Sequence, residues 1–467
     1  MTLSFDEASL INKLESKLKK KVWKNLDNYN YYDGRLKVKD LGVSIPKRLK
    51  NLDDVLGWAS APVDTLTERV QFDSWYSANI DDDQDLINDL IAQYKMNNVD
   101  LEQQKVAKDS FITGHSYISV GVGDTTIGEP PIIYMAESPN EVYGDFNLRT
   151  KRLDNALKKV KSEKGWIGAL YLPDQTIYIA KGNNSSMWVE TDRQVHDLGF
   201  IPIVPVINNP DTNNLRGRSE ITKPLKSVID SGMRILLLAE VGNAYYALPQ
   251  FFLLGADASS YYDADGNPTT YMDWLAGKIK VLPADSNGQS PQMTQVAAND
   301  AGNILDQLTI YATLAAREIG LPPSYFGFDT VNPSSADAIQ LADERVITKA
   351  NNRIKHQKQA WKQAFAYGQI MLNGDLPDSW LNIEPVFIDP ATPTPAATAD
   401  RLSKLQALGV FDKDLPQWVY KELGLTDMEI AQTKDFIQKS QGNQLINTLL
   451  TQNPSTINLT PSDGTGS

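Results

Sequence analysis

The residue types that could support nucleophilic or metal chemistry are scarce in this chain. Its 467 residues include no cysteine and three histidines, His115, His196 and His356, which lie far apart. Disulfides, zinc-thiolate sites, iron–sulfur clusters on cysteine and thiol nucleophiles are therefore excluded. No two histidines share one helix, so a paired-histidine metal motif is absent as well. We interpret each histidine as a surface or locally hydrogen-bonded residue.

Two groups of aspartates resemble cation sites at first sight. Asp81, Asp82 and Asp83 precede an apolar-periodic segment. We interpret them as the charged start of a helix over 84–95, because carboxylates stabilise the positive end of a helix dipole. Asp263 and Asp265 lie in Tyr261-Tyr-Asp-Ala-Asp-Gly-Asn-Pro, which lacks the distal glutamate of an EF-hand and is more typical of a hairpin turn. The sequence predicts no metal and no cofactor.

Glycine and serine motifs indicate no catalytic centre. Gly121-x-Gly123 lacks the third glycine and the following helix of a dinucleotide-binding loop. Gly114-His-Ser116 lacks the glycine that a nucleophile elbow carries two residues after its serine. We therefore expect no enzyme. One alternative stays open, an α+β enzyme acting on carbohydrate or nucleic acid, because some pair of acidic residues could meet the separation of about 5–10 Å that glycoside hydrolysis requires.

Charge and hydropathy limit the partners. The formal net charge is −13 and the pI about 4.9, which argues against tight wrapping of nucleic acid, because that needs Lys and Arg spread along the phosphates. No stretch approaches the ~18 consecutive apolar residues of a membrane span. The start at Met1 carries no basic leader followed by an apolar run. We expect a soluble protein that is not secreted by that route and binds no membrane.

The stretch from Gly320 to Trp361 organises the predicted elements. Pro322, Pro323 and Pro333 keep residues 320–335 irregular, so a loop is expected there. Ser334 or Ser335 can cap a long helix that continues toward Leu372. Its apolar residues recur at helical steps, which predicts one buried face made of Ile339, Ala342, Val346, Ala350, Ile354, Trp361 and Phe365. Polar residues that include Lys349 and Arg353 lie off that face.

The first 210 residues are predicted to form one α+β domain. Helices are expected over 4–26, 51–70 with a break at Pro62, 84–95 and 100–113, and residues 28–34 form an aromatic cluster closed by a turn. A strand is expected over 115–122, and alternating apolar residues between turn residues over 130–206 predict an antiparallel sheet with one covered face. Pro202 and Pro205 place the last strand at an edge.

Beyond residue 210 the predicted elements are long helices with a small insertion. Helices over 219–247 and 298–319 flank a β-containing segment that begins at 251–254 and returns as a strand at 278–283. A closing strand over 383–390, a linker over 391–397, short helices over 398–408, 414–423 and 426–438, and a mobile tail over 441–467 follow. The fold class is therefore α+β and mainly helical.

This order of elements resembles the portal proteins of tailed bacteriophages, most of all the siphovirus type. The residues that carry the resemblance are Asn30-Tyr-Tyr-Asp-Gly34, Asn98-x-Asp100, Asp109, Gly114, Ile201-Pro-Ile-Val-Pro to Asn208, Gly217-Arg-Ser-Glu-Ile221, Ile229-Asp230, Glu240 to Pro249-Gln250, Leu321-Pro-Pro and Asn332-Pro-Ser-Ser-Ala-Asp-Ala338. The likeness extends over residues 10–430. No single phrase is diagnostic, but their order is specific.

The resemblance implies a homo-oligomeric ring, usually a dodecamer, at one capsid vertex of the virion, assembled in the host cytoplasm. Such a ring is the channel for viral DNA entry during packaging and exit during ejection. Implied partners are double-stranded DNA passing without sequence specificity, the terminase large subunit, the head–tail adaptor, and the major capsid and scaffolding proteins. A capsid scaffold or adaptor without a channel remains an alternative.

The resemblance also assigns regions. They are a wing over 1–216 and 336–395, stem helices over 217–247 and 298–319, a clip over 248–297, a tunnel loop over 320–335, a crown over 396–440 and a flexible tail over 441–467. We expect the loop residues Phe328, Asp329, Thr330, Val331 and Asn332 to face DNA. The clip residues expected at the terminase or adaptor contact are Tyr261, Tyr262, Asp263, Asp265 and Trp274.

Overall fold

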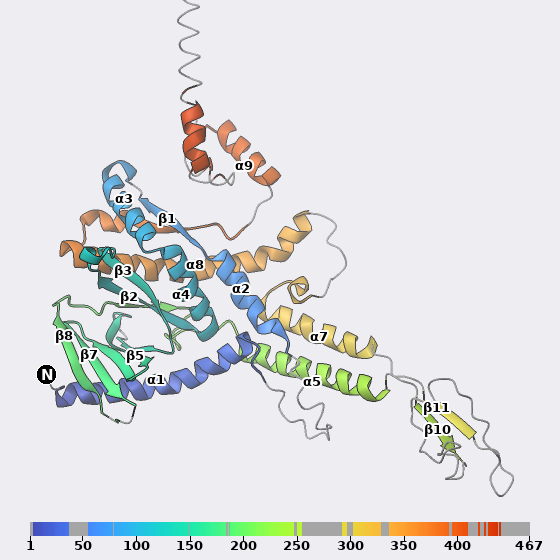
Figure 1. The fold of residues 1–467 in the computed structure, drawn as a ribbon. Helices are drawn as coiled ribbons and strands as arrows, with labels where there is room; N and C mark the ends of the chain where they lie inside the picture. Colours follow the sequence, from blue (N-terminus) through green and yellow to red (C-terminus); the bar gives the residue numbers. More distant parts are fainter. Residues whose placement is uncertain are drawn as a thin grey trace, which may run out of the picture. The chain divides into compact units, whose positions relative to one another are not determined.

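The structure of the chain is a computed structural model (Figure 1). It describes residues 3–36, 55–77, 79–147, 149–183, 185, 187–246, 250–254, 292–296, 302–327, 336–391, 395–409, 419, 420, 425, 428–437 and 439. The chain divides into two compact units, 1–390 and 391–467. Helices and small antiparallel sheets together make an α+β fold, as the sequence predicted.

The first helix covers a five-stranded antiparallel sheet (Figure 1). This helix, α1 (Phe5–Tyr32), starts at a capping box in which Ser4 and Glu7 satisfy each other's backbone N–H groups. The sheet has the order β4 (Val142–Phe146), β5 (Leu153–Ser162), β6 (Gly165–Tyr171), β7 (Gln175–Gly182), β8 (Val189–Val195). Ile11, Leu14 and Leu18 of α1 pack against Leu157, Leu170 and Ile177 of the sheet. The predicted covered face is therefore confirmed.

A second, three-stranded sheet lies against the helices of the main core. Its order is β3 (Ile132–Glu137), β2 (His115–Val122), β9 (Ile203–Ile207), so the proline-containing strand is an edge strand as predicted. The helices that contact this sheet are α4 (Val99–Thr113) and α8 (Ala336–Asn373), and α2 (Ser60–Arg69) and α3 (Ile80–Met96) pack against α4. The prediction of one antiparallel sheet over 130–206 was wrong, because β3 and β9 pair with β2 rather than with β4–β8.

Two strands that are distant in sequence form a third small sheet. β1 (Phe72–Ser77) pairs antiparallel with β12 (Ile383–Phe387). The closing strand was predicted, but β1 was not, because its partner is more than 300 positions away and its short run FDSWYS gives little local signal. Phe72 stacks on Phe387, with ring centroids 5.3 Å apart. The contact ties the end of the first unit to its beginning.

The long helix α8 (Ala336–Asn373) confirms the predicted rod and most of its buried face. Val346, Ala350, Ile354, Trp361 and Phe365 are all buried in the main core. The side chains of Ile339 and Ala342 lie outside the described ones. Short 3-10 helices flank α8, namely η4 (Pro323–Phe326) before it and η5 (Asp378–Asn382) after it, and two more are η1 (Gly57–Ala59) and η2 (Thr125–Ile127).

A pair of helices extends from the main core, with a hairpin between them in sequence. α5 (Lys223–Tyr246) and α7 (Gly302–Ile319) pack side by side (Figure 1). β10 (Gln250–Leu254) pairs antiparallel with β11 (Gln292–Val296). In the second unit, α9 (Pro395–Ala407) and helical residues 428–437 agree with two predicted short helices.

Several predicted boundaries moved for physical reasons. α1 continues to Tyr32 instead of ending near Leu26, because the buried Asn28 amide donates to the Ile112 carbonyl at 2.7 Å and holds the last turns in place. α5 starts at Lys223 rather than Ser219, because Ser219 and Glu220 are engaged with other elements. Pro62 lies in the first turn of α2, where proline is tolerated, and breaks nothing.

Several predictions fall outside the described residues. These are the strand over 278–283, the turn over 261–268, most of the helix over 414–423 and the tail over 441–467. Among the helices that the structure describes, none is long and apolar enough to cross a membrane.

The ion pair that fixes α1 to β8 makes stability depend on pH. Arg193 donates to Glu7 at 2.8 Å, and this hydrogen bond lowers the pKa of Glu7 from 4.5 to about 2 against the opposing effect of burial. A carboxyl with a depressed pKa contributes stability above its unfolded-state pKa, and loses it as the pH falls through the folded-state value. We therefore expect stability to decline between about pH 5 and pH 2.

The variant Glu7→Gln should remove that part of the pH dependence while keeping the capping box, which accepts glutamine. The measurement is the urea midpoint at a series of pH values for the wild type and the variant. Asp6→Asn, one position earlier and exposed, is the matched control and should keep the wild-type slope. Parallel curves for wild type and Glu7→Gln would show that this pair contributes nothing.

Candidate functional site

The most concentrated polar structure in the main core is built on two glycines with left-handed backbones. Gly114 (φ +96°) ends α4, and Gly217 (φ +76°) lies in the loop between β9 and α5. A Cβ on Gly217 would lie 2.3 Å from the Gly114 carbonyl oxygen and 2.4 Å from that of Asn208. Only glycine therefore allows the two backbones to approach this closely.

Backbone hydrogen bonds join the same segments. The Asn208 N–H donates to the Gly114 carbonyl at 2.9 Å, and the Arg218 N–H donates to the Asn208 carbonyl at 2.8 Å. The Glu220 N–H donates to the Phe111 carbonyl at 2.8 Å, and the Ser219 hydroxyl donates to the Ile112 carbonyl at 2.6 Å. These bonds satisfy carbonyls that the end of α4 leaves without helical partners. The loop is thereby fixed to α4.

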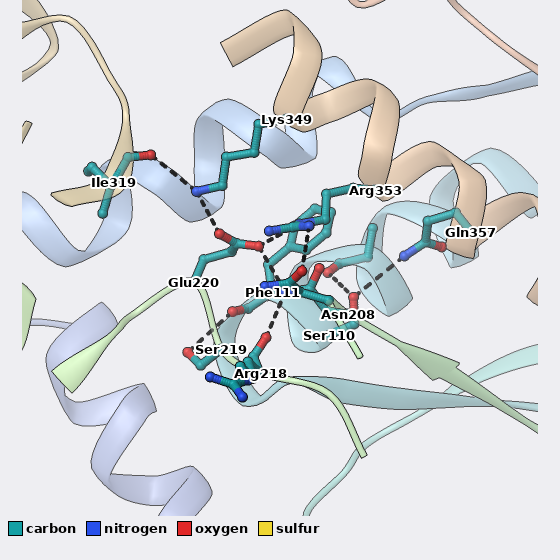
Figure 2. A network of polar contacts seen from close by, with 12 residues as sticks. Ser110, Phe111, Asn208, Arg218, Ser219, Glu220, Ile319, Lys349, Arg353 and Gln357 are labelled. Atoms are coloured by element: carbon teal, nitrogen blue, oxygen red, sulfur yellow. Dashed lines mark hydrogen bonds and ion pairs between the residues drawn. The ribbon is translucent and has the colours of Figure 1, made fainter. Parts of the chain in front are cut away.

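Glu220 extends from this loop to α8 (Figure 2). Its carboxylate accepts from Arg353 Nε at 2.7 Å, from Lys349 Nζ at 2.7 Å and from the Asn208 side chain at 2.9 Å. Glu220 is 4% exposed and Arg353 8%. Burial would raise the pKa of Glu220, but Lys349 and Arg353 outweigh burial and hold the pKa below its usual range. We call Asn208, Glu220, Lys349 and Arg353 the Glu220 junction.

The junction also reaches the end of α7. Lys349 Nζ donates to the Ile319 carbonyl at 3.2 Å, beside its contact with Glu220. Arg353 donates to the Asn209 side chain at 3.2 Å. The start of α5, the end of α7 and the middle of α8 are therefore held at one point (Figure 2).

A second set of hydrogen bonds connects α1 with α4 and α5. Tyr29 donates to Asp109 of α4 at 2.7 Å, and Tyr31 donates to Asp230 of α5 at 2.7 Å. Burial raises the pKa of Tyr31, and Asp230 raises it further. Both tyrosines therefore stay protonated donors. Two residues of the aromatic cluster predicted over 28–34 thus hydrogen-bond α1 to α4 and α5.

The histidines do not form a reactive group. His196 lies 3.3 Å from the Thr176 hydroxyl, which confirms a local hydrogen-bonded role. His115 corrects the prediction, because it is buried and neither of its ring nitrogens makes a well-formed hydrogen bond with a described residue. Burial, with Lys21 and Arg216 nearby, lowers the pKa of His115 to about 3, so the ring is neutral. Within the described ranges no three His, Asp or Glu side chains come together as a metal site.

The sequence-predicted site residues are not among those that the structure describes. Phe328, Asp329, Thr330, Val331 and Asn332 lie outside the described residues. The same is true of the clip residues Tyr261, Tyr262, Asp263, Asp265 and Trp274.

The Glu220 junction was only partly visible from sequence. Glu220, Asn208, Gly114 and Gly217 belong to the phrases that carry the family resemblance, but no role was predicted for them. Lys349 and Arg353 were predicted to lie off the buried face of α8, whereas Arg353 is buried. Their spacing of four residues on one helix is a signal for a shared acidic partner. The partner, Glu220, is 133 positions from Arg353, and no local sequence pattern identifies it.

The fold and the junction define an α+β scaffold whose buried polar groups hold long helices together. Comparison with known proteins makes this specific. The chain belongs to the family of phage portal proteins described as SPP1 Gp6-like, whose model matches residues 11–441. The resemblance found in the sequence is thereby confirmed. As a phage portal protein, the chain is a virion component of the capsid vertex, and its family is a structural class.

Two relatives have the same description. The portal protein of Mycobacterium phage L5 is 30% identical over 393 residues, which cover 82% of this chain and 78% of the relative. The portal protein of Mycobacterium phage D29 is 28% identical over 443 residues, covering 91% and 88%. Among solved structures, the neck of an empty GTA particle computed with C6 symmetry is similar with a TM-score of 0.43, 14% identity and coverage of 82% and 95%. The neck of a native GTA particle computed with C12 symmetry gives a TM-score of 0.39, 14% identity and coverage of 79% and 92%.

The energetic role of the junction can be tested with Glu220→Gln. This variant leaves Lys349 and Arg353 facing each other without their carboxylate, and breaking a buried ion pair in this way typically costs about 3–5 kcal/mol. The measurement is the free energy of unfolding from urea titration.

The matched control is Glu384→Gln, in β12, which removes the carboxylate partner of another α8 cation. Glu384 pairs with Lys362 of α8 at the same 2.7 Å, but its side chain is 56% exposed. Exposed pairs contribute about 0–1 kcal/mol, so this variant should remain close to the wild type. Equal small losses for both variants would contradict the structural role assigned to Glu220.

Proposed function

We propose that copies of this chain close into a ring, a dodecamer, at one capsid vertex, and that the ring is the channel through which viral DNA enters during packaging and leaves during ejection. The observation that carries the proposal beyond family membership is the apolar surface of the α5–α7 pair. Leu238 of α5 is 47% exposed, and Ile310 and Leu314 of α7 are 60% and 44% exposed. Identical neighbours around an axis could cover these side chains.

Burial of such a surface favours assembly. Each apolar side chain removed from water contributes about 25 cal/mol per Å², and a closed ring repeats that contribution at every interface. The helices that carry the surface are 24 and 18 residues long. They are anchored at one end by the Glu220 junction, so copies could pack along these rods while the anchor fixes their direction.

The charge of the chain suits a conduit for DNA. A pore that passes a genome must not hold any one phosphate, because each neutralised phosphate adds affinity through counterion release. The net charge of −13 gives a surface that repels DNA overall. We propose that Phe328, Asp329, Thr330, Val331 and Asn332 face the DNA within a tunnel loop over 320–335.

The other regions follow the same assignment. We propose a wing over 1–216 and 336–395, stem helices over 217–247 and 298–319, a clip over 248–297 and a crown over 396–440. The clip residues Tyr261, Tyr262, Asp263, Asp265 and Trp274 would contact the terminase large subunit during packaging and the head–tail adaptor afterwards. Major capsid and scaffolding proteins would contact the ring during assembly in the host cytoplasm.

The alternatives differ in what they require. An α+β enzyme acting on carbohydrate or nucleic acid would need a pair of carboxylates at a substrate cleft, and a nuclease or glycosidase assay would detect it. An adaptor without a channel would need no large closed ring. The ring model is preferred because it accounts for the exposed apolar side chains of α5 and α7.

Assembly gives the first test. In native mass measurements the wild type should form a particle near twelve times 51.9 kDa, whereas Ile310→Asp should shift the population toward single chains. The control is Ile127→Asp in η2, where the replaced side chain is 72% exposed and outside the α5–α7 pair. A lone particle of 51.9 kDa for the wild type under all conditions, including phage-infected lysates, would contradict the ring.

The tunnel loop gives the second test. Deletion of residues 328–332 should leave ring mass unchanged and lower the amount of DNA packaged into heads, because the loop would contact DNA but not neighbouring chains. The measurement is nuclease-protected DNA per particle. Unchanged packaging by intact mutant rings would remove the assignment of these residues.

A further inference from the structure

A large basic pocket lies beside the Glu220 junction. Its volume is about 1110 Å³, and its lining comes from α1, the loop between β9 and α5, the start of α5, the end of α7 and α8. Nine lysines and arginines line it, against three acidic residues. A net surplus of positive charge in one concavity is unexpected in a chain with a net charge of −13. This surplus of positive charge is typical of a site that binds an anion.

Part of that charge is already compensated within the chain. Lys349 and Arg353 pair with Glu220, and Lys226 pairs with Asp27. Arg216 pairs with Asp145 and Arg218 with Asp211, both outside the lining. Glu318, the third acidic residue of the lining, accepts from the Thr222 hydroxyl at 2.8 Å. All three carboxylates are thereby engaged.

Four other cations in the lining have no such partner. Lys21, Lys24, Lys223 and Arg345 make no ion pair and no hydrogen bond with any residue that the structure describes. Lys21 and Lys24 belong to α1, Lys223 is the first residue of α5, and Arg345 belongs to α8. Three helices therefore each place positive charge at the same pocket, without an acidic partner among the described residues. Such an arrangement raises the free energy of the empty pocket, because like charges in one concavity repel. Lys21 is partly buried, whereas Lys24, Lys223 and Arg345 are exposed.

Lys21 lies close enough to Lys24 and Arg216 for their charges to interact. Partial burial, together with Lys24 and Arg216, lowers the pKa of Lys21 to about 8. The Arg216 guanidinium stacks 4.4 Å from the centroid of the Tyr143 ring, and its Nη1 atom is buried without a hydrogen-bond partner. Its Nη2 atom donates to the Gly144 carbonyl at 2.9 Å and lies 3.7 Å from Asp145, so Arg216 is held in place near Lys21.

The first turn of α5 adds to the positive potential. Thr222, Lys223 and Pro224 belong to the pocket lining, and α5 is 24 residues long. The N-terminus of a helix carries a partial positive charge and backbone N–H groups that favour anions. The helix dipole and the four cations that have no partner among the described residues point to the same kind of ligand.

We propose that this pocket binds a phosphate-bearing anion, with Lys21, Lys24, Lys223 and Arg345 as its charged contacts. Phosphate groups place several negative charges and many acceptor oxygens in a small volume, which matches cations arriving from three sides. The fork of Arg345 suits bidentate contact with phosphate oxygens. Carboxylates of an acidic peptide would bring one charge per side chain and demand a longer binding surface. The proposal concerns a single chain and does not depend on ring closure.

Two sources could supply this chemistry, a free polyphosphate or the phosphodiester backbone of duplex DNA. The experiment uses the full chain in thermal unfolding, titrated with sodium tripolyphosphate and, separately, with a short DNA duplex. Sodium chloride at matched ionic strength corrects for screening. A ligand that binds only the folded state raises the midpoint with its concentration. A specific rise with tripolyphosphate identifies a free-anion site, and a rise with the duplex alone identifies the DNA backbone as the source.

The variants Lys21→Met and Arg345→Met separate binding from folding. Each should weaken the apparent affinity by about tenfold or more, since a hydrogen bond to a charged group contributes roughly this much. Lys21→Met should also unfold at the same temperature as the wild type or higher without ligand, because it removes a repelled charge. Lys20→Met, an exposed neighbour on α1 outside the pocket lining, is the matched control and should keep the full response.

The proposal is overturned if neither ligand raises the midpoint above the salt control, or if Lys20→Met and Lys21→Met respond alike. It is also overturned if Lys21→Met leaves the ligand response intact but changes the particle mass, since the pocket would then receive an acidic segment of a second copy. Particle mass reports on the ring and the ligand response reports on the pocket, so failure of one is distinguishable from failure of the other.

Discussion

Glu220 is a carboxylate that the fold removes from water, and a buried carboxylate is tolerated only while cationic partners and hydrogen bonds surround it. Lys349 and Arg353 meet this requirement from α8, and Asn208 meets it from the end of β9. The constraint acts in both directions, since the two cations are themselves partly or fully buried. The entry to α5 can therefore take one position relative to α8, and the direction of the α5–α7 pair follows from that position.

The two glycines explain why the constraint can be met at all. With a side chain at Gly114 or Gly217 the loop would stand away from the end of α4, and Glu220 would not reach the cations of α8. Tyr31 and Asp230 then hold the next turns of α5 against α1. Backbone proximity, one buried ion cluster and one partly buried hydrogen bond thus act in series along the eleven residues from Glu220 to Asp230.

Much of this fold could be predicted from the sequence, because its signals are local. The seam from Val346 to Phe365 specifies α8, and Gly114 marks the end of α4. Residues that depend on distant partners gave no such signal. In the sequence, Arg353 is one of several cations on the polar face of α8, and only the fold brings Glu220 to it. Phe72 likewise begins a strand because β12 pairs with it, and β12 is distant in sequence. The channel and clip residues came from resemblance alone, and they remain predictions.

Net charge is a poor guide to where this chain can bind an anion. The value of −13 describes the far field, which screening reduces beyond about 10 Å at moderate salt. Within the basic pocket the near field dominates, and there partial burial, together with the nearby charges of Lys24 and Arg216, lowers the pKa of Lys21. An acidic exterior and a cationic pocket are compatible for this reason. Because cations of α1, α5 and α8 line the pocket, an anion within it would relieve repulsion among these three helices. Two of them, α5 and α8, also meet at the Glu220 junction, so the same anion would strengthen the anchor of the α5–α7 pair.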